Sequence, residues 1–142
     1  MKMRSPSRVA VTSRSFSKNA GLVSALGQRI AHPTLNEYGQ SLSGQDLCDF
    51  LQGHDAAIVG LELVSRSLFE RVPELKIISK YGVGLDSLDL DAFDAAGVCL
   101  GWTPGVNRHS VAELAVSAMI SLLHRVPEAT SDVIAGHWRQ WR

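Results

Sequence analysis

Short, nearly continuous apolar runs recur along the chain and are separated by helix-like segments. In residues 8–12, 56–60 and 75–80 the apolar residues follow one another without alternation. This pattern is typical of strands that are covered on both faces, as strands of parallel sheets are. We therefore predict five strands, at residues 8–12, 29–32, 56–60, 75–80 and 98–101.

The segments between these runs carry recognisable helix start and stop signals. We expect one helix that Ser17 caps and that ends at Leu26 before Gly27, and a second at 45–51 after Ser43. A helical turn opens with the capping pair Ser67 and Glu70, and a last helix lies at 90–96 between Asp89 and Gly97. Because strands and helices alternate, right-handed crossovers predict an α/β fold with a flavodoxin-like, doubly wound, parallel five-stranded sheet in the order 2-1-3-4-5.

After the fifth run the pattern changes, and we divide the chain into a domain at 1–104 and a helical extension at 105–142. The turn Thr103-Pro104-Gly105 leads to a helix from Val111 to His124, for which Ser110 and Glu113 have the spacing of a capping box, and a further helix follows Pro127. The long helix is apolar almost all the way round, and such helices are normally buried on more than one side. We therefore expect a homo-oligomer that forms through Val111 to Leu123.

Composition narrows the classes of partner. The 142 residues are 45% hydrophobic, which suits one globular core, and 14 basic residues balance 14 acidic ones. A neutral chain has no electrostatic signature for nucleic acid or an anionic membrane, and no apolar stretch is long enough to span a bilayer. The basic, Ser-rich residues 1–8 are not followed by a signal-peptide core. Cys48 and Cys99 lie in apolar runs and are expected to be buried, reduced thiols of a cytoplasmic protein.

The segment from Lys80 to Gly84, directly after the fourth run, is the strongest candidate for chemistry. Its glycines allow a sharp turn in which successive backbone N–H groups form a nest for a carboxylate or phosphate, and Lys80 adds a positive charge. The alternative is an ordinary strand-to-helix turn with a solvated lysine. A dinucleotide-binding GxGxxG motif is not formed, because its third glycine is replaced by Ser87.

Other catalytic and metal-binding motifs are absent from the sequence. It has no GxSxG, HExxH, CxxC or phosphate-binding P-loop motif, which leaves hydrolase, protease and nucleotide triphosphatase functions without support. His109 and Glu113 are four residues apart, but two ligands do not make a metal site. We assign no metal site and no catalytic residue to this chain.

Several blocks together resemble the D-isomer-specific 2-hydroxyacid dehydrogenases, particularly the D-3-phosphoglycerate dehydrogenase branch. The likeness extends from about the third strand to Gly136-His-Trp138. The matching blocks, in the order and spacing of that family, are Leu75 to Asp86 (LKIISKYGVGLD), Leu88 to Leu90, Gly97-Val98, Thr103-Pro104-Gly105, Asn107 and Ser110 to Glu113.

The resemblance implies a substrate domain in which the loop that matches Tyr81, Gly82, Val83 and Gly84 holds the carboxylate of a 2-hydroxy or 2-oxo acid through backbone amides. It implies that the helix matching Ser110 onward lies near the nicotinamide and contributes to a dimer, and that Asn107 lies in the cleft between domains. The cofactor of the complete enzyme would be NAD or NADP.

The departures from the family are equally informative. The family's cofactor domain, which holds the glycine-rich motif and the catalytic arginine, glutamate and histidine, is not in these residues, nor is a segment that completes its substrate domain. We therefore expect a truncated product, a split subunit or a cut chain, inactive alone and without strong cofactor binding. Glu62 replaces a phosphate-binding arginine, which argues against phosphoglycerate, and Trp102 replaces a polar residue. The alternative is a non-enzymatic small-carboxylate-binding or partner-binding module of the same fold.

Overall fold

The computed structural model describes residues 8–138 and 140, so most of the basic N-terminal segment considered above lies outside it. The chain divides into two compact units, residues 1–104 and residues 105–142. Each unit is described by itself.

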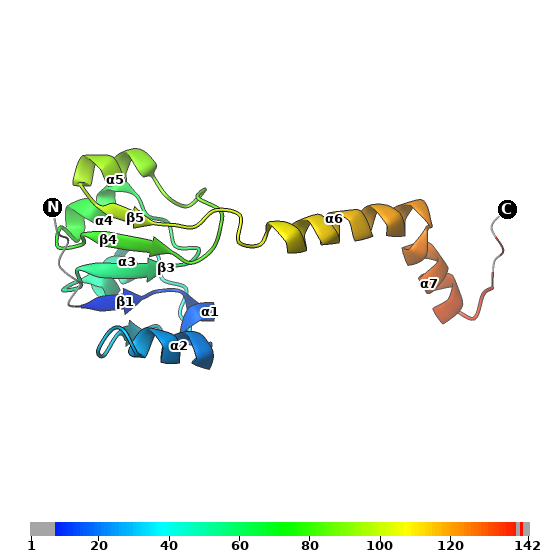
Figure 1. Cartoon of the computed structure of the whole chain (residues 1–142), viewed down its shortest axis with the longest axis horizontal. Coiled ribbons are helices and arrows are strands. Elements are labelled where there is room, and N and C mark those ends of the chain that lie inside the picture. The colour runs from blue at the N-terminus through cyan, green and yellow to red at the C-terminus, as the bar shows by residue number, and fades with distance from the viewer. Residues whose placement is uncertain (1–7, 139, 141–142) are drawn as a thin grey trace. The chain divides into compact units, whose positions relative to one another are not determined.

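The first unit is built on a five-stranded sheet in which every pair of neighbouring strands is parallel. The strands lie in the order β2-β1-β3-β4-β5, which confirms the predicted flavodoxin-like topology (Figure 1). Val11 on β1 pairs with Leu35 on one side and Ile58 on the other. The strands are β1 (Val9–Val11), β2 (Thr34–Leu35), β3 (Ala56–Val59), β4 (Ile77–Lys80) and β5 (Cys99–Gly101).

The described residues of this unit form five helices: α1 (Arg14–Ser17), α2 (Ala20–Gly27), α3 (Gly44–Leu51), α4 (Arg66–Arg71) and α5 (Leu90–Ala96). One face of the sheet packs against α3, α4 and α5, and this face holds the main core. Because β1 connects to β2 in the opposite direction from the later crossovers, right-handed connections place α1 and α2 on the other face. The largest fully buried side chains include Leu47, Leu51, Leu75, Ile78 and Val72.

The second face of the sheet is less covered than the apolar runs predict. Ile77 is half-buried and its neighbour Cys99 is exposed, whereas Cys48 on α3 is buried as expected. The expectation of two buried thiols is therefore wrong for Cys99. Its side chain shares the Ile77 face, which is the face that α3, α4 and α5 do not cover.

The segment between β1 and β2 differs from the prediction. The second strand lies at residues 34–35 and not at 29–32, because His32 has a left-handed φ of 54° that a strand does not accommodate. The helix expected from Ser17 to Leu26 is α2, which begins at Ala20, and the short helix α1 precedes it. Ser13 caps α1 and Asn19 caps α2, while the Ser17 hydroxyl accepts a hydrogen bond from the Asn36 amide at 3.1 Å.

Of the other capping residues predicted for this unit, some are observed at helix ends and one is not. Asp89 caps α5 by accepting from the Ala92 amide at 3.1 Å, and Gly97 follows with φ 65°, both as predicted. The start of α3 after Ser43 is also confirmed. Ser67 does not open α4, however, because the N-cap residue is Ser65.

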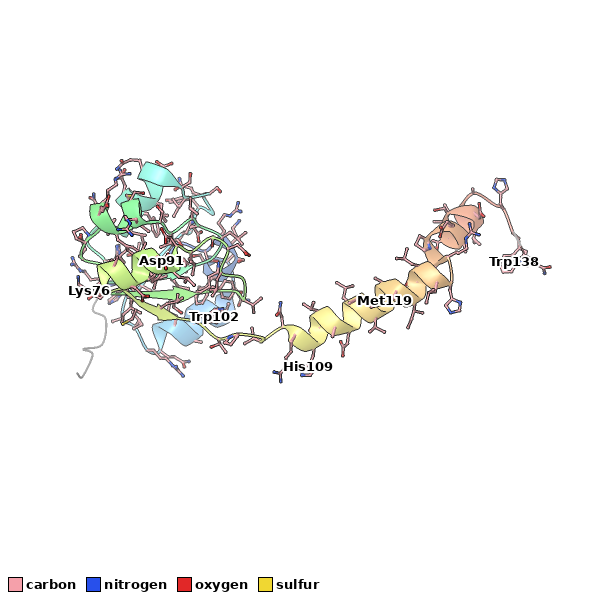
Figure 2. All side chains as sticks on the ribbon, turned by 90° about the horizontal axis from the view of Figure 1, so that it is seen from above. Lys76, Asp91, Trp102, His109, Met119 and Trp138 are labelled. Carbon is pink, nitrogen blue, oxygen red and sulfur yellow. The ribbon has the colours of Figure 1, made fainter. Side chains whose placement is uncertain are left out.

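In the second unit the described residues form α6 (Arg108–Leu123) and α7 (Val126–Ile134), which are in contact near the turn that joins them (Figure 1). Asn107 is the N-cap residue of α6, so Ser110 lies inside the helix and its expected capping role is wrong. Within the described residues, no helix is long and apolar enough to cross a membrane. Side chains project from α6 all around its axis, Met119 among them (Figure 2). The exposed large apolar residues of α6 are Val111, Leu114, Val116, Met119, Ile120, Leu122 and Leu123.

Candidate functional site

The loop after β4 presents backbone donors at the carboxyl edge of the sheet. The Tyr81 amide donates to the Val59 carbonyl at 2.7 Å, which anchors the start of the loop to β3. Gly82 then adopts a φ of 131°, a conformation that L side chains rarely adopt. Within residues 8–138, the amides of Gly82, Val83 and Gly84 donate to no protein acceptor. The loop therefore offers three successive N–H groups to a ligand.

The Lys80 side chain ties the loop to its neighbour and does not extend freely into solvent. It is half-buried, and its Nζ donates to the Gly60 carbonyl and to the Ser87 hydroxyl, the latter at 3.4 Å. These contacts join the segment after β3 to the far end of the loop. Lys80 thus contributes positive charge beside the loop while its hydrogen bonds hold the loop's shape.

A cleft of about 570 Å³ opens beside Tyr81, whose ring packs edge-on against Phe16 with centroids 5.3 Å apart. Its walls come from the segments after β1, β2, β3 and β4, at the carboxyl ends of four neighbouring strands. Between β1 and β3 the order of strands reverses, and open α/β sheets bind ligands at such a switch point. Residues that line it with Tyr81 include Ser13, Arg14, Lys18, Gly60 and Glu62.

The cleft carries charges of both signs. Arg14 and Lys18 on and after α1 supply two cations, and Lys18 reaches over Gly39. The Glu62 carboxylate accepts a hydrogen bond from the Gly60 amide at 2.6 Å. A polar ligand would therefore meet both hydrogen-bond donors and an acceptor here.

The sequence alone did not single out the walls of this cleft. Ser13, Arg14 and Lys18 follow β1 and are not among the residues that the sequence predicts for a site, and Glu62 enters that prediction only as the residue in place of an arginine. The signal that identifies them is topological, because residues just after adjacent parallel strands meet at one edge of the sheet.

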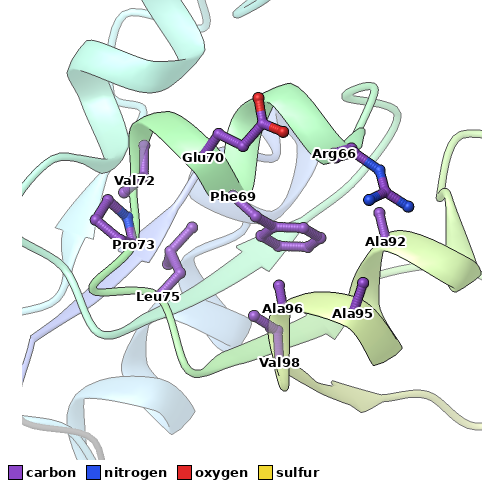
Figure 3. A pocket seen from close by; sticks show the side chains of 10 residues that line it. All are labelled: Arg66, Phe69, Glu70, Val72, Pro73, Leu75, Ala92, Ala95, Ala96 and Val98. Atoms are coloured by element: carbon purple, nitrogen blue, oxygen red, sulfur yellow. The ribbon is translucent and has the colours of Figure 1, made fainter.

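A second hollow, of about 280 Å³, lies between α4 and α5 (Figure 3). Leu75 and Val98, which precede β4 and β5, help to line it, so it lies at the amino edge of the sheet, opposite to the loop. Most of the residues that line it are apolar, and Phe69 packs edge-on against Phe93 with centroids 5.0 Å apart. Its position and lining make it part of the helix packing and not a site for chemistry.

Glu74, a carboxylate at the amino edge, has a shifted pKa. The Gly53 amide donates to Glu74 Oε1 at 3.1 Å and, with the backbone amide of Glu74 itself, lowers the pKa of that carboxyl below its usual value. This hydrogen bond joins the turn after α3 to the turn before β4. The shift therefore has a structural cause remote from the loop.

Asn107 and Ser110, the residues expected near a nicotinamide, lie at the start of α6 in the second unit. Both are exposed within the chain.

The residues that the structure describes contain no group of three or more histidine, cysteine, aspartate or glutamate side chains that could hold a metal ion.

Comparison with known proteins decides the family. The family model for the catalytic domain of D-isomer specific 2-hydroxyacid dehydrogenases matches residues 12–137 of this sequence. The chain belongs to this family. The predicted resemblance is thereby confirmed, and the match includes both the loop after β4 and helix α6.

Members of the family from distant organisms are similar to this chain. It is 43% identical over 67 residues to the glyoxylate reductase/hydroxypyruvate reductase of Mus musculus, covering 47% of this chain and 20% of that protein. It is 30% identical over 108 residues to the D-3-phosphoglycerate dehydrogenase of Methanocaldococcus jannaschii, covering 75% of this chain and 20% of that protein. The matching segment thus spans about a fifth of the length of either relative.

A solved structure extends the likeness to the fold. The NAD-dependent formate dehydrogenase of Staphylococcus aureus, determined in complex with NAD, superposes with a TM-score of 0.72 and 27% identity. The superposition covers 93% of this chain and 43% of that enzyme. The family is thus an oxidoreductase family whose members include NAD-dependent enzymes.

Proposed function

We propose that this chain is the substrate-binding part of an NAD-dependent 2-hydroxyacid dehydrogenase, and that the amides of Gly82, Val83 and Gly84 hold the substrate carboxylate. The observation that carries the proposal is the set of three backbone donors without protein acceptors, placed beside a polar cleft at the switch point of the sheet. Hydrogen bonds from N–H groups to a carboxylate are charge-assisted and stronger than neutral ones.

In this proposal the two units have different tasks. Residues 1–104 bind and orient the acid: the loop after β4 grips its carboxylate, and the rest of the molecule lies toward Tyr81 and the cleft. Residues 105–142 carry Asn107 and Ser110 toward the cofactor and provide the surface for self-association. Lys80 adds a favourable charge next to the loop.

The residues present do not fit a dinucleotide. The loop with glycines at 82 and 84 has Ser87 where the dinucleotide motif requires a third glycine, and no other segment of the sequence has the motif. We therefore derive no hydride step within these 142 residues. NAD, which supplies the hydride acceptor of such a reaction, would be bound by other residues of the complete enzyme.

Calorimetric titration of the 142-residue chain with glyoxylate tests the proposal. Two or three hydrogen bonds from backbone N–H groups, in a site open to water, give an expected dissociation constant for glyoxylate on the order of 1 mM. Gly82→Ala places a Cβ where φ is 131°, and holding that conformation costs about 1–3 kcal/mol. The loop can relieve this strain by changing conformation, which moves the N–H groups, so glyoxylate should bind at least about fivefold more weakly.

Gly27→Ala is the matched control, because Gly27 lies at the end of α2 with open space around its Cβ position. It should bind glyoxylate like the unmodified chain. No heat of binding for the unmodified chain at the highest soluble glyoxylate concentration would contradict the proposal, as would equal affinity for the Gly82→Ala variant with its secondary structure intact.

A further inference from the structure

Trp102 follows β5 (Figure 2) and contacts the middle of the candidate loop. Its indole Nε1–H donates to the Val83 carbonyl at 3.2 Å, although the two residues are 19 positions apart in the sequence. We propose that Trp102 is a positioning residue that aims the Gly84 N–H at the substrate carboxylate. This inference rests on the proposed function of the loop.

The geometry of the peptide group gives the hydrogen bond its consequence. The Val83 carbonyl and the Gly84 N–H belong to one peptide unit, which is planar and trans, so they point to opposite sides. Holding the carbonyl against Trp102 therefore directs the N–H away from Trp102. Within residues 8–138 that N–H meets no protein acceptor, so it is available to a ligand.

The other contacts of the loop act at its ends. The Tyr81 amide is held by the Val59 carbonyl, and Lys80 holds Ser87 and the Gly60 carbonyl. Between these anchors, glycines flank Val83 on both sides, and glycine imposes little restriction on backbone rotation. The contact from Trp102 is the one side-chain hydrogen bond found for the Val83–Gly84 peptide in the described residues.

A rotated peptide would have an acceptor nearby. The Asp86 Oδ2 atom lies 3.2 Å from where a Cβ of residue 84 would be. Once the contact with Trp102 is lost, this carboxylate can compete with the substrate for the Gly84 N–H. The hydrogen bond on the carbonyl also polarises the amide, and such coupling strengthens the donor by about 10–30%.

Trp102→Phe tests the inference, because it keeps an aromatic ring and removes the N–H donor. We expect glyoxylate to bind about fivefold to tenfold more weakly, which corresponds to part of one charge-assisted hydrogen bond. Trp138→Phe is the matched control, since Trp138 is 82% exposed and lies in the other unit, and it should bind like the unmodified chain. In ¹⁵N NMR spectra of Trp102→Phe, the glyoxylate-induced shift of Gly84 should shrink more than that of Val83, whereas a general loss of structure would reduce both.

The indole N–H resonance of Trp102 provides a second measurement that needs no variant. In the unmodified chain it should move during glyoxylate titration, while that of Trp138 stays constant. If glyoxylate binds the unmodified chain but Trp102→Phe retains full affinity, or the Trp102 resonance does not move, the inference is overturned and the proposed function remains. If glyoxylate does not bind the unmodified chain, the proposed function itself fails.

Discussion

The 142-residue chain is expected to oxidise no NADH when it is mixed with glyoxylate or hydroxypyruvate. Hydride transfer requires a bound nicotinamide, and the sequence has no dinucleotide motif. It also requires a group that moves a proton within hydrogen-bond reach of the substrate. His32 and His54 precede β2 and β3, so they lie at the amino edge of the sheet, opposite to the Tyr81 loop.

The assay follows NADH absorbance, with a full-length glyoxylate reductase measured in parallel as the positive control. His54 is engaged elsewhere, because its ring nitrogens contact the Gln52 carbonyl at 3.1 Å and the Thr34 hydroxyl at 2.8 Å. Turnover by the chain that clearly exceeds a heat-inactivated sample would show that these residues contain catalytic groups that we have not identified.

The chain is also expected to self-associate through α6. Large apolar side chains on this helix remain exposed, and burying a Leu, Ile or Met contributes roughly 1.5–3 kcal/mol. Met119 is 58% exposed and Leu122 is 69% exposed. An apolar surface of this kind marks an interface or an aggregation hazard. Sedimentation velocity at increasing concentration should therefore show species larger than a monomer.

Charged substitutions locate the interface. Met119→Glu or Leu122→Glu should shift the chain toward monomer, because association would bury an unpaired carboxylate. Thr130→Glu adds the same charge at an exposed polar position of α7 and should leave association unchanged. A chain that stays monomeric at high micromolar concentration, or a Thr130→Glu variant that dissociates as readily as Met119→Glu, would contradict the assignment.

The sheet could be predicted because its signals are local and redundant. Apolar runs mark β1, β3 and β4, and Asp89 with Gly97 marks both ends of α5. The errors fall where several residues compete for one role. Ser13, Ser17 and Asn19 can each cap a helix, and tertiary contacts decide among them, since the Ser17 hydroxyl bonds to the Asn36 amide.

The candidate site was predictable only in part, for a similar reason. Gly82 and Gly84 allow the loop after β4 to be predicted, because an unusual backbone conformation commonly requires a glycine at that position in the sequence. The cleft beside the loop could not be predicted in this way, since Arg14 and Glu62 line it together with Tyr81 only after three strands have aligned. The hydrogen bond from Trp102 to Val83 likewise depends on the position of β5 relative to β4.

An NMR titration of the ¹⁵N-labelled chain with glyoxylate measures the central claim most directly, because it reports every backbone amide separately. The carboxylate-binding role of the loop predicts that the amides of Gly82, Val83 and Gly84 shift first and furthest, with smaller changes at Tyr81. Shifts that gather instead around Phe69 and Ala95, in the hollow between α4 and α5, or that leave the loop unchanged at saturation, would contradict it.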